Sequence, residues 1–308
     1  MSDKYKSINT VGAVIVLYQP NLDNLVQLLN SVLAQLTHVC LVDNTPNPDS
    51  TLATQAISLG VMYHAFGTNQ GISHAQNVGV NHLLMRNIEA VLLLDQDSII
   101  PYDYISRMWE FYENLLETDK RLAAIGPSYI DVKTGRRSYA IRYSWWGGIV
   151  RRSYTISDGP IQVDYVISSG SLINIQALRE VGSMNESLFI YWVDVEWGLR
   201  ALAIGYKSFL IPSVSIYHSV GQKVVRIGPI KFVSHDNFRQ YFILRNPWLM
   251  LRQEHLPLTM RCVTIISLFV KYMPIYWLTS KHKRLTIKTF YLALRDGLMN
   301  RGGTPPQL

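Results

Sequence analysis

The first 120 residues alternate between two hydrophobic patterns. Short apolar runs bounded by turn residues are typical of buried strands, and apolar residues three or four positions apart are typical of amphipathic helices. These patterns predict strands at 11–18, 39–44, 61–66 and 90–94 and helices at 22–36, 50–59, 72–87 and 103–117. Such an alternation predicts an α/β fold in which a mostly parallel sheet lies between two layers of helices.

The pattern changes after residue 120. Residues 125–173 predict short strands and turns that add an antiparallel part to the sheet, with RSYAIRYSWWGGIV and VDYVISSGSLINI as the main strands. A helix is then predicted from about Asp194 to Gly205, followed by a strand at 209–218.

Four predicted strands end in polar residues, namely Tyr18, Asp43, the turn at 67–69, and the pair Asp95 and Asp97. The carboxyl ends of parallel strands meet at one edge of a sheet, where ligands of open α/β sheets bind. In an extended chain, Asp95 and Asp97 point to the same side. Two carboxylates there would hold a divalent cation, which would hold phosphate oxygens. The alternative is an exposed turn, where Asp and Ser are common.

The segment GTNQGISHAQNVG at 67–79 is rich in Gly and Asn. Its amides suit a ribose or a base edge, and a loop with a helix cap is the alternative. Neither a G-x-G-x-x-G after the first strand nor a Walker lysine motif occurs. The sequence therefore does not favour a Rossmann dinucleotide site or a P-loop ATPase.

A second group of candidates follows residue 185. Glu196 and Arg200 have the i,i+4 spacing of a helical ion pair. Asp194 either caps this helix or faces the cleft as a base. His218, at a strand end, either binds metal or phosphate or is a satisfied neutral residue. Trp145 and Trp146 either stack on a sugar or pack in the core.

Charge divides the chain unevenly. The 308 residues carry a net charge of +7, yet residues 1–206 hold 14 Lys and Arg against 19 Asp and Glu, and residues 207–308 hold 15 against 3. The acidic first part argues against a nucleic-acid enzyme. The basic, apolar C-terminal part suggests an anionic lipid surface or a pyrophosphate-bearing partner. Two cysteines without metal-ligand spacing and an N-terminus without an apolar core predict a cytoplasmic location.

The C-terminal third carries the apolar segment 256–284. Its longest run without charge, 262–270, is far shorter than the roughly 20 residues of a spanning helix. Because Arg261, Lys271 and Pro274 interrupt the segment, we expect helices that lie in the membrane interface, peripheral to the inner face of the plasma membrane. A helical subdomain packed on the catalytic core or on another subunit of a homo-oligomer is the alternative. The expected domains are 1–225 and 226–308.

The ordered motifs carry a family resemblance over nearly the whole chain. They are VIVLYQP, LVDN, NQGISHAQNVG, LLLDQDS, SGSLINIQALREVG, FIYWVDVEWGLRALAIGY and LRDGLMNRGG. With them the chain resembles the family 2 glycosyltransferases of the GT-A fold, and within these the bacterial rhamnosyltransferases that build O-antigen and other surface polysaccharides. The resemblance implies dTDP-β-L-rhamnose as donor, Mg²⁺ or Mn²⁺ as cofactor, and a glycan on polyprenyl diphosphate as acceptor. It also implies inversion at the anomeric carbon.

The resemblance also implies roles for individual residues. Tyr18 and Asp43 would flank the nucleotide base, and Asn69 and Gln76 would belong to the loop that contacts the nucleoside. Asp95 would meet ribose or metal, Asp97 would ligate the metal, and His218 would lie near metal and pyrophosphate. Asp194 would be the catalytic base. Asp194 follows Val193 where the family usually has Glu. Gln76 stands where many members carry Arg, and Leu17 where a hydroxyl residue is common.

Other functions fit the same fold. A glycosyltransferase with another nucleotide sugar is the main alternative. A sugar nucleotidyltransferase would want a Gly-rich basic loop after the first strand, which YQPNLDNL lacks. A non-catalytic sugar-binding protein would have no reason to keep Asp43, Asp95, Asp97 and Asp194 together.

Overall fold

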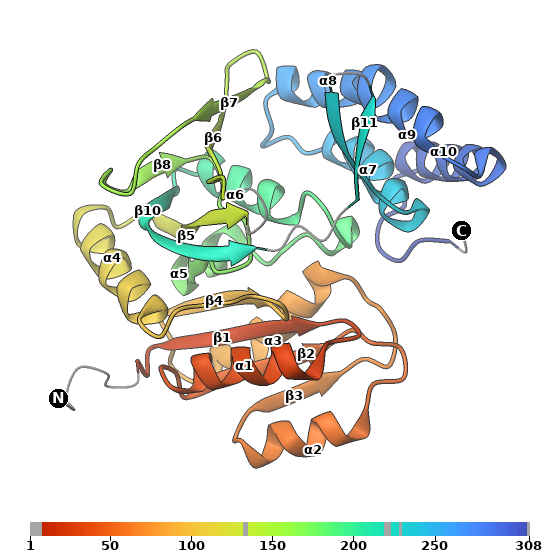
Figure 1. The fold of residues 1–308 in the computed structure, drawn as a ribbon. Coiled ribbons are helices and arrows are strands. Elements are labelled where there is room, and N and C mark those ends of the chain that lie inside the picture. The colour runs from red at the N-terminus through yellow and green to blue at the C-terminus, as the bar shows by residue number, and fades with distance from the viewer. Residues whose placement is uncertain (1–7, 132–134, 219–222, 228–229, 307–308) are drawn as a thin grey trace.

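A computed structural model describes residues 8–131, 135–218, 223–227 and 230–306 (Figure 1). An eight-stranded sheet in the order β3-β2-β1-β4-β9-β5-β10-β8 runs through it. Its strands are β1 Val11–Leu17, β2 His38–Asp43, β3 Met62–Ala65, β4 Ala90–Asp95, β5 Leu122–Asp131, β8 Ile161–Val163, β9 Leu172–Asn174 and β10 Lys207–His218. The predicted α/β fold is confirmed.

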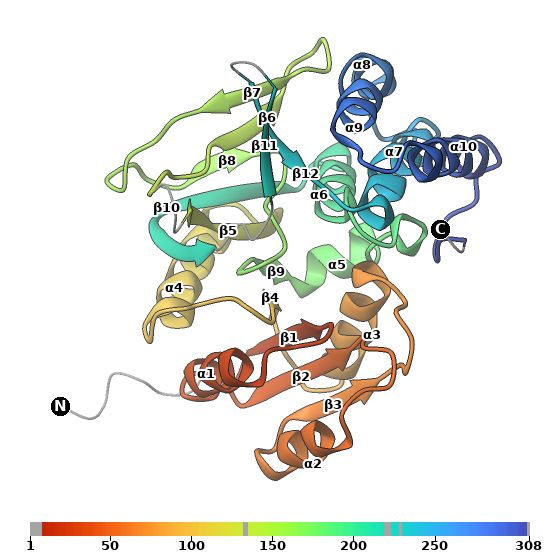
Figure 2. The same cartoon turned by 45° about the vertical axis from the view of Figure 1, so that its right-hand side comes forward.

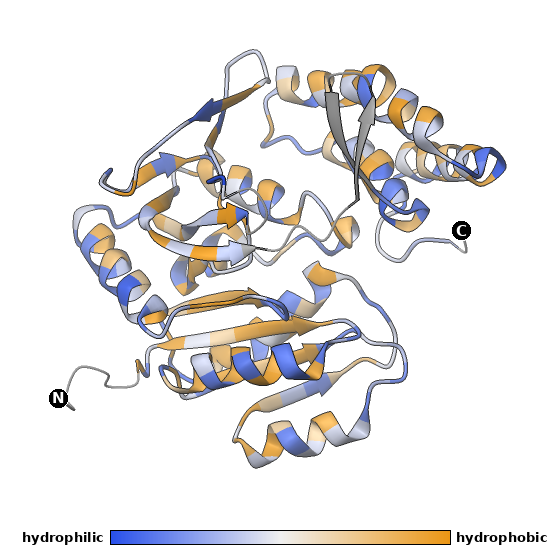
Figure 3. Cartoon of the chain, viewed as in Figure 1, coloured by the Kyte–Doolittle hydropathy of each residue, from blue (hydrophilic) through white to orange (hydrophobic). Residues whose placement is uncertain are grey.

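Strand directions divide the sheet into two parts. β3, β2, β1 and β4 are parallel. β9 then runs antiparallel between β4 and β5, while β10 is parallel to β5 and β8 closes the edge antiparallel to β10. β1 and the body of β4 are almost fully buried because their apolar residues face helices on both sides (Figure 3).

Helices cover both faces of the sheet (Figures 1 and 2). One face packs against α1 Leu22–Leu33, α2 Ser50–Ser58 and α4 Tyr104–Thr118. The other packs against α3 Ile72–Leu84, α5 Ile175–Val181 and α6 Val193–Ala203. Gly79 lets α3 approach the sheet closely, since a Cβ there would lie 2.4 Å from Cγ1 of Val14.

The antiparallel part differs in detail from the prediction. The segment RSYAIRYSWWGGIV is not one strand but a hairpin of β6 Ala140–Tyr143 and β7 Ile149–Arg152, because Ser144–Gly148 form a turn. The segment VDYVISSGSLINI contributes β9, while its residues 164–171 form a connecting loop. The long strand β5 is parallel to β10, which the sequence pattern did not predict.

The C-terminal region is helical after a second hairpin, β11 Lys223–Ile227 and β12 Ile230–Ser234. Its helices are α7 Asn237–Met250, α8 Leu258–Ser267, the π-helix η2 Leu268–Tyr272, α9 Met273–Thr279 and α10 Lys283–Leu298. They share a hydrophobic cluster with Phe189, just before α6. The division into domains 1–225 and 226–308 stays a prediction.

The apolar segment forms one continuous helix. Arg261, Lys271 and Pro274 interrupt its apolar run but not its backbone, because α8, η2 and α9 are continuous from Leu258 to Thr279, and its place in the membrane interface stays a prediction. The π-helical turn immediately precedes Pro274, which lacks a backbone N–H, and π-turns absorb such breaks in the hydrogen-bond ladder. Among the described residues, this 22-residue helix is the one long and apolar enough to cross a membrane by length and composition.

Candidate active site

The Asp95–Asp97 pair lies in a tight turn at the end of β4. The Ser98 N–H donates to the Asp95 carbonyl at 3.1 Å, which closes the turn. The chain is therefore not extended here, so the alternation of side chains along a strand does not direct both carboxylates to one side. Asp95 is half-buried and Asp97 is exposed. The turn leaves Asp97 open to a ligand from solvent.

Gln96, between the two acids, joins the ends of β4 and β1. Its Oε1 accepts from the Tyr18 N–H at 2.7 Å, and its Nε2 donates to the Tyr18 carbonyl at 3.1 Å. The Tyr18 side chain is 45% exposed. The backbone carrying Tyr18 is thus fixed, while the side chain is accessible from solvent. The sequence pattern does not predict this role of Gln96, because only the pairing of β1 with β4 brings it to Tyr18.

Asp43 lies beside Leu17 at the end of β2 and is buried. One carboxylate oxygen accepts from the Thr45 N–H and the other from the Tyr63 hydroxyl, both at 2.8 Å. Burial, together with the bond to Asp43, raises the pKa of Tyr63 above its usual range. Asp43 is therefore held in one orientation at the same edge as Tyr18.

The loop before α3 is organised by two asparagines. Asn69 Oδ1 accepts from the Gly71 N–H at 3.0 Å. Asn44 accepts from the Gln70 N–H at 3.0 Å and donates to the Gly71 carbonyl at 3.1 Å. The residue that caps α3 is Gly71, which has no capping side chain. Asn69 thus shapes the turn and does not cap the helix.

Gln76 lies on the buried face of α3 and is 3% exposed. Its Oε1 has no hydrogen-bond partner among the described residues. A buried acceptor left unsatisfied costs about 1–3 kcal/mol, so a donor from a ligand there would be stabilising.

The loop 168–171 contacts both acidic centres. Ser169 Oγ accepts from the Asp95 N–H at 3.3 Å and lies 2.9 Å from Ser98 Oγ. The neighbouring Ser168 N–H donates to the Asp194 carboxylate. Adjacent residues of one loop therefore join the end of β4 to the start of α6. The sequence pattern does not predict this link, which depends on contacts between residues far apart in the chain.

Tyr129 gives a second link between the acids. Its hydroxyl donates to the carbonyls of Ile167 and Ser169. Burial raises its pKa well above the usual range, and the charges of Tyr104, Asp95 and Asp194 raise it further. Asp95 and Asp194 therefore act electrostatically on the same hydroxyl, although 99 residues separate them in the sequence.

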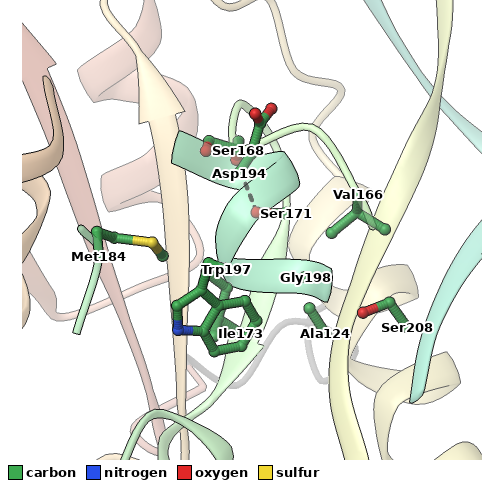
Figure 4. A pocket seen from close by; sticks show the side chains of 10 residues that line it. All are labelled: Ala124, Val166, Ser168, Ser171, Ile173, Met184, Asp194, Trp197, Gly198 and Ser208. Atoms are coloured by element: carbon green, nitrogen blue, oxygen red, sulfur yellow. Dashed lines mark hydrogen bonds between the residues drawn. The ribbon is translucent and has the colours of Figure 1, made fainter. Parts of the chain in front are cut away.

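Asp194 is the second residue of α6, and Trp192 holds the N-cap position in a left-handed conformation. Of the two alternatives for Asp194, the one in which it occupies the N-cap position was wrong, although its Oδ1 accepts from the Val195 N–H at 2.9 Å. Burial raises the pKa of the carboxyl even though backbone N–H groups, including those of Val195 and Ser168, donate to it. Figure 4 shows the carboxylate beside Ser168, pointing away from Trp197, at the edge of a small pocket that also contains Ser171 and Ser208.

Glu196 has a different setting on the same helix. It forms the predicted ion pair with Arg200, with two N–O distances of 3.0 Å. Arg200 also donates to the carbonyls of Val181 and Ser183 at 2.8 Å. Glu196 thus ties α6 to the end of α5.

His218 is the last residue of β10, and its side chain lies outside the described part of the structure. An antiparallel bridge between Ile99 and Tyr217 places the end of β10 beside the turn after β4. Within the described residues, no group of three His, Cys, Asp or Glu side chains gathers as a closed metal cage. Proteins can hold Mg²⁺ through only one or two carboxylates plus substrate phosphates, so a role for Asp95 and Asp97 in metal binding stays a prediction.

Trp145 and Trp146 lie in the turn of the β6–β7 hairpin. They are 87% and 51% exposed, so the core alternative was wrong for both. The Trp145 carbonyl accepts from Thr259 Oγ1 at 2.8 Å, which joins the hairpin to the start of α8. Stacking on a sugar stays a prediction.

Known sequences include a matching family domain and a relative that aligns with most of this chain. The model of the glycosyl transferase family 2 domain matches residues 13–182. A dTDP-rhamnosyl transferase, RfbF, from Shigella flexneri is 31% identical over 293 residues, which cover 94% of this chain and 96% of RfbF.

Comparison with solved structures finds the same fold at low sequence identity. TarS residues 1–349 from S. aureus in complex with UDP-GlcNAc match with a TM-score of 0.58 and 14% identity, over 95% of this chain and 81% of that one. GalNAc-T7 with UDP, GalNAc and Mn²⁺ matches with a TM-score of 0.55 and 15% identity, over 88% of this chain but only 57% of its own.

Proposed function

We propose a specific reaction for this chain, which belongs to glycosyl transferase family 2 and is a glycosyltransferase. The reaction is the transfer of L-rhamnose from dTDP-β-L-rhamnose to an acceptor hydroxyl, with inversion to an α-L-rhamnoside. The name and coverage of the Shigella relative support the donor. The observation that carries the chemistry is the loop 168–171, whose neighbouring residues contact Asp95 and Asp194.

The edge formed by β1, β2 and the loop before α3 would bind the nucleotide. Tyr18 is exposed on a fixed backbone, and Asp43 is oriented by two hydrogen bonds. The loop around Asn69 is fixed by hydrogen bonds to Asn69 and Asn44, and Gln76 has a buried acceptor without a partner among the described residues. These groups suit the hydrogen-bonding edge of a base and a ribose.

Asp97 and Asp95 would hold a divalent cation together with the donor diphosphate. When bound there, Mg²⁺ or Mn²⁺ neutralises charge on the leaving diphosphate. With the diphosphate at this edge of the sheet, the two carboxylates would repel its negative charge unless a cation lay between them. Donor binding should therefore depend on the metal.

Asp194 would act as the general base. It takes the proton of the acceptor hydroxyl while that oxygen forms a bond to the anomeric carbon and the bond from that carbon to the diphosphate breaks. A base works best when its pKa is near the operating pH. Burial raises the pKa of Asp194 toward that range. Inversion in one displacement needs no covalent enzyme intermediate.

A panel of nucleotide sugars tests the reaction. We expect dTDP-β-L-rhamnose with Mn²⁺ to give transfer or slow hydrolysis, and UDP and GDP sugars to give less. Faster turnover of another nucleotide sugar would replace rhamnose as the donor. Release of pyrophosphate from dTTP and a sugar phosphate would support a nucleotidyltransferase instead.

The acceptor would be a glycan on polyprenyl diphosphate used in surface-polysaccharide or O-antigen synthesis, reached at the cytoplasmic leaflet. The helix Leu258–Thr279 supports this, since only 11% of its apolar stretch is buried by the rest of the protein. Ile266 and Val270 are 58% and 75% exposed, and the helix is largely apolar in Figure 3. The exposed Lys281 and Arg284 follow it and would meet anionic headgroups.

Vesicle flotation with the full chain tests the membrane surface. The change of Ile266 and Val270 to Asp should abolish binding to vesicles that contain phosphatidylglycerol, because burial of a charge in the acyl region of the bilayer is energetically unfavourable. Met85→Asp, at a site 86% exposed at the end of α3, serves as the control. Equal binding by all three proteins would contradict the membrane proposal.

A further inference from the structure

The segment 187–192, which leads into α6, is strained. Phe189, Tyr191 and Trp192 have φ angles of +63°, +64° and +69°. None is glycine, and a left-handed conformation costs such residues about 1–3 kcal/mol each unless the surroundings enforce it. The base Asp194 follows two residues after this segment, so whatever holds the segment also sets the direction of Asp194.

Asn246 on α7 holds the segment by its backbone carbonyls. It is fully buried, and its Nδ2 lies 3.0, 2.8 and 3.1 Å from the carbonyl oxygens of Leu188, Ile190 and Tyr191. One amide group thus binds carbonyls on both sides of Phe189. A side chain without an N–H donor at this position would remove a hydrogen bond from the Ile190 and Tyr191 carbonyls, whereas the Leu188 carbonyl would keep its bonds from Arg245 and the Ile190 N–H.

Arg245 reinforces the same contact. It is fully buried, and its guanidinium donates to Asn246 Oδ1 at 2.9 and 3.1 Å and to the Ser187 carbonyl at 2.9 Å. The guanidinium lies over the ring of Phe242, which stacks on Phe189 with centroids 4.8 Å apart. The planar guanidinium carries five N–H donors that match these acceptors, and a lysine ammonium cannot make the same set of hydrogen bonds.

The C-terminal tail completes the arrangement. Arg245 donates to the Gly303 carbonyl at 2.8 Å, and the Gly303 N–H donates to the Ser187 carbonyl at 2.7 Å. A Cβ on Gly302 would lie 2.4 Å from Ser187 Cβ, so the tail approaches the segment more closely than other residues could. The motif LRDGLMNRGG therefore has a physical role beside α7 (Figure 2).

On its other side, the segment contacts the loop before α3, which is proposed to bind the donor and is called the donor loop below. The Phe189 carbonyl accepts from the Ile72 N–H at 2.8 Å at the start of α3. Gly71 has φ +88° and no room for a Cβ, which would meet the Phe189 ring at 2.7 Å. The segment 187–192 therefore lies between the donor loop, the base and the C-terminal helices.

We propose that Arg245 and Asn246 are positioning residues that hold segment 187–192, and through it Asp194, in the geometry needed for proton transfer. This inference rests on the proposed role of Asp194 as the base. It assigns the C-terminal helices a part in the reaction beyond membrane contact.

Two variants test the proposal in the full chain, Asn246→Ala and the milder Arg245→Lys. Displacement of a reacting group by about 1 Å can cost on the order of 10²-fold in rate. We expect kcat to fall by about that factor in Asn246→Ala and less in Arg245→Lys. The KM for the donor should change little, because Asn44 also holds the donor loop.

The pH profile separates positioning from mere stability. If the segment loosens, Asp194 becomes more hydrated, its raised pKa falls, and the acid limb of the kcat profile moves to lower pH. Arg252→Lys is the matched control, since Arg252 follows α7 and donates to the carbonyls of Gly297 and Leu298 but does not contact segment 187–192. It should lower thermal stability and leave kcat and the acid limb in place.

Asp194→Asn is measured in parallel. If it keeps wild-type turnover, the base is wrongly assigned and both proposals fall. If it loses turnover while Asn246→Ala and Arg245→Lys, checked as folded by circular dichroism, keep wild-type kcat and acid limb, only the positioning proposal is overturned. If Asn246→Ala does not fold, Arg245→Lys decides.

Discussion

The two acidic centres of this glycosyltransferase are built differently. Asp97 is exposed in a turn after β4, in the part of the chain whose strands and helices follow from the local hydrophobic pattern. Asp194 is half-buried at the start of α6, behind a strained segment held by residues more than 50 positions away. An exposed carboxylate can share a cation with a diphosphate, whereas a half-buried one with a raised pKa can take a proton. The two proposed roles therefore rest on the environment of each carboxylate more than on the residue type.

The largest expected effect concerns the base. Asp194→Asn keeps the shape of the side chain and removes its basicity. General-base catalysis contributes about 10²–10⁴-fold, so turnover should fall by at least that range while dTDP still binds. Rapid-quench assays and calorimetry measure the two quantities, and Asp103→Asn at the N-cap of α4 is the control. Retained turnover would refute the assignment.

The next effect should appear at the other centre. Asp97→Asn removes one carboxylate charge where the cation is expected. The affinity for dTDP should then lose its dependence on Mn²⁺, which titration calorimetry with and without the metal measures. An unchanged response to Mn²⁺ would place the metal elsewhere.

A third substitution tests the difference between the two acids of α6, Asp194 and Glu196. Glu196→Gln removes the charge that pairs with Arg200, four residues along the helix. We expect a loss of about 1.5 kcal/mol in the free energy of unfolding, typical of a hydrogen bond to a charged group. Turnover per folded molecule should stay at the wild-type level. Inactivation as severe as in Asp194→Asn would remove the distinction between the two acids.

The smallest effect is on stability and depends on pH. Because burial raises the pKa of Asp194, the folded state binds its proton more tightly than the unfolded state, and ionisation opposes folding at neutral pH. Asp194→Asn should therefore be more stable than wild type at pH 7. The difference should shrink as the pH falls toward the ordinary aspartate pKa of 3.8. Chemical denaturation at several pH values measures it, and a destabilised variant at pH 7 would contradict it.

The local pattern of the sequence predicted the elements of the first 118 residues, because strand and helix periods are short-range signals. It missed contacts between distant residues. Gln96 meets Tyr18 across 78 positions, and Asn246 meets Leu188 across 58. It also treated Asp95 and Asp97 as extended, since a turn closed by one backbone hydrogen bond leaves no periodic trace.

The most direct test of the central claim is anomalous scattering from Mn²⁺ in crystals grown with dTDP. The account predicts a manganese peak between the Asp97 carboxylate and the diphosphate, with Asp194 facing the same pocket but not bound to the metal. A manganese peak on Asp194, or a diphosphate bound away from Asp97, would contradict it.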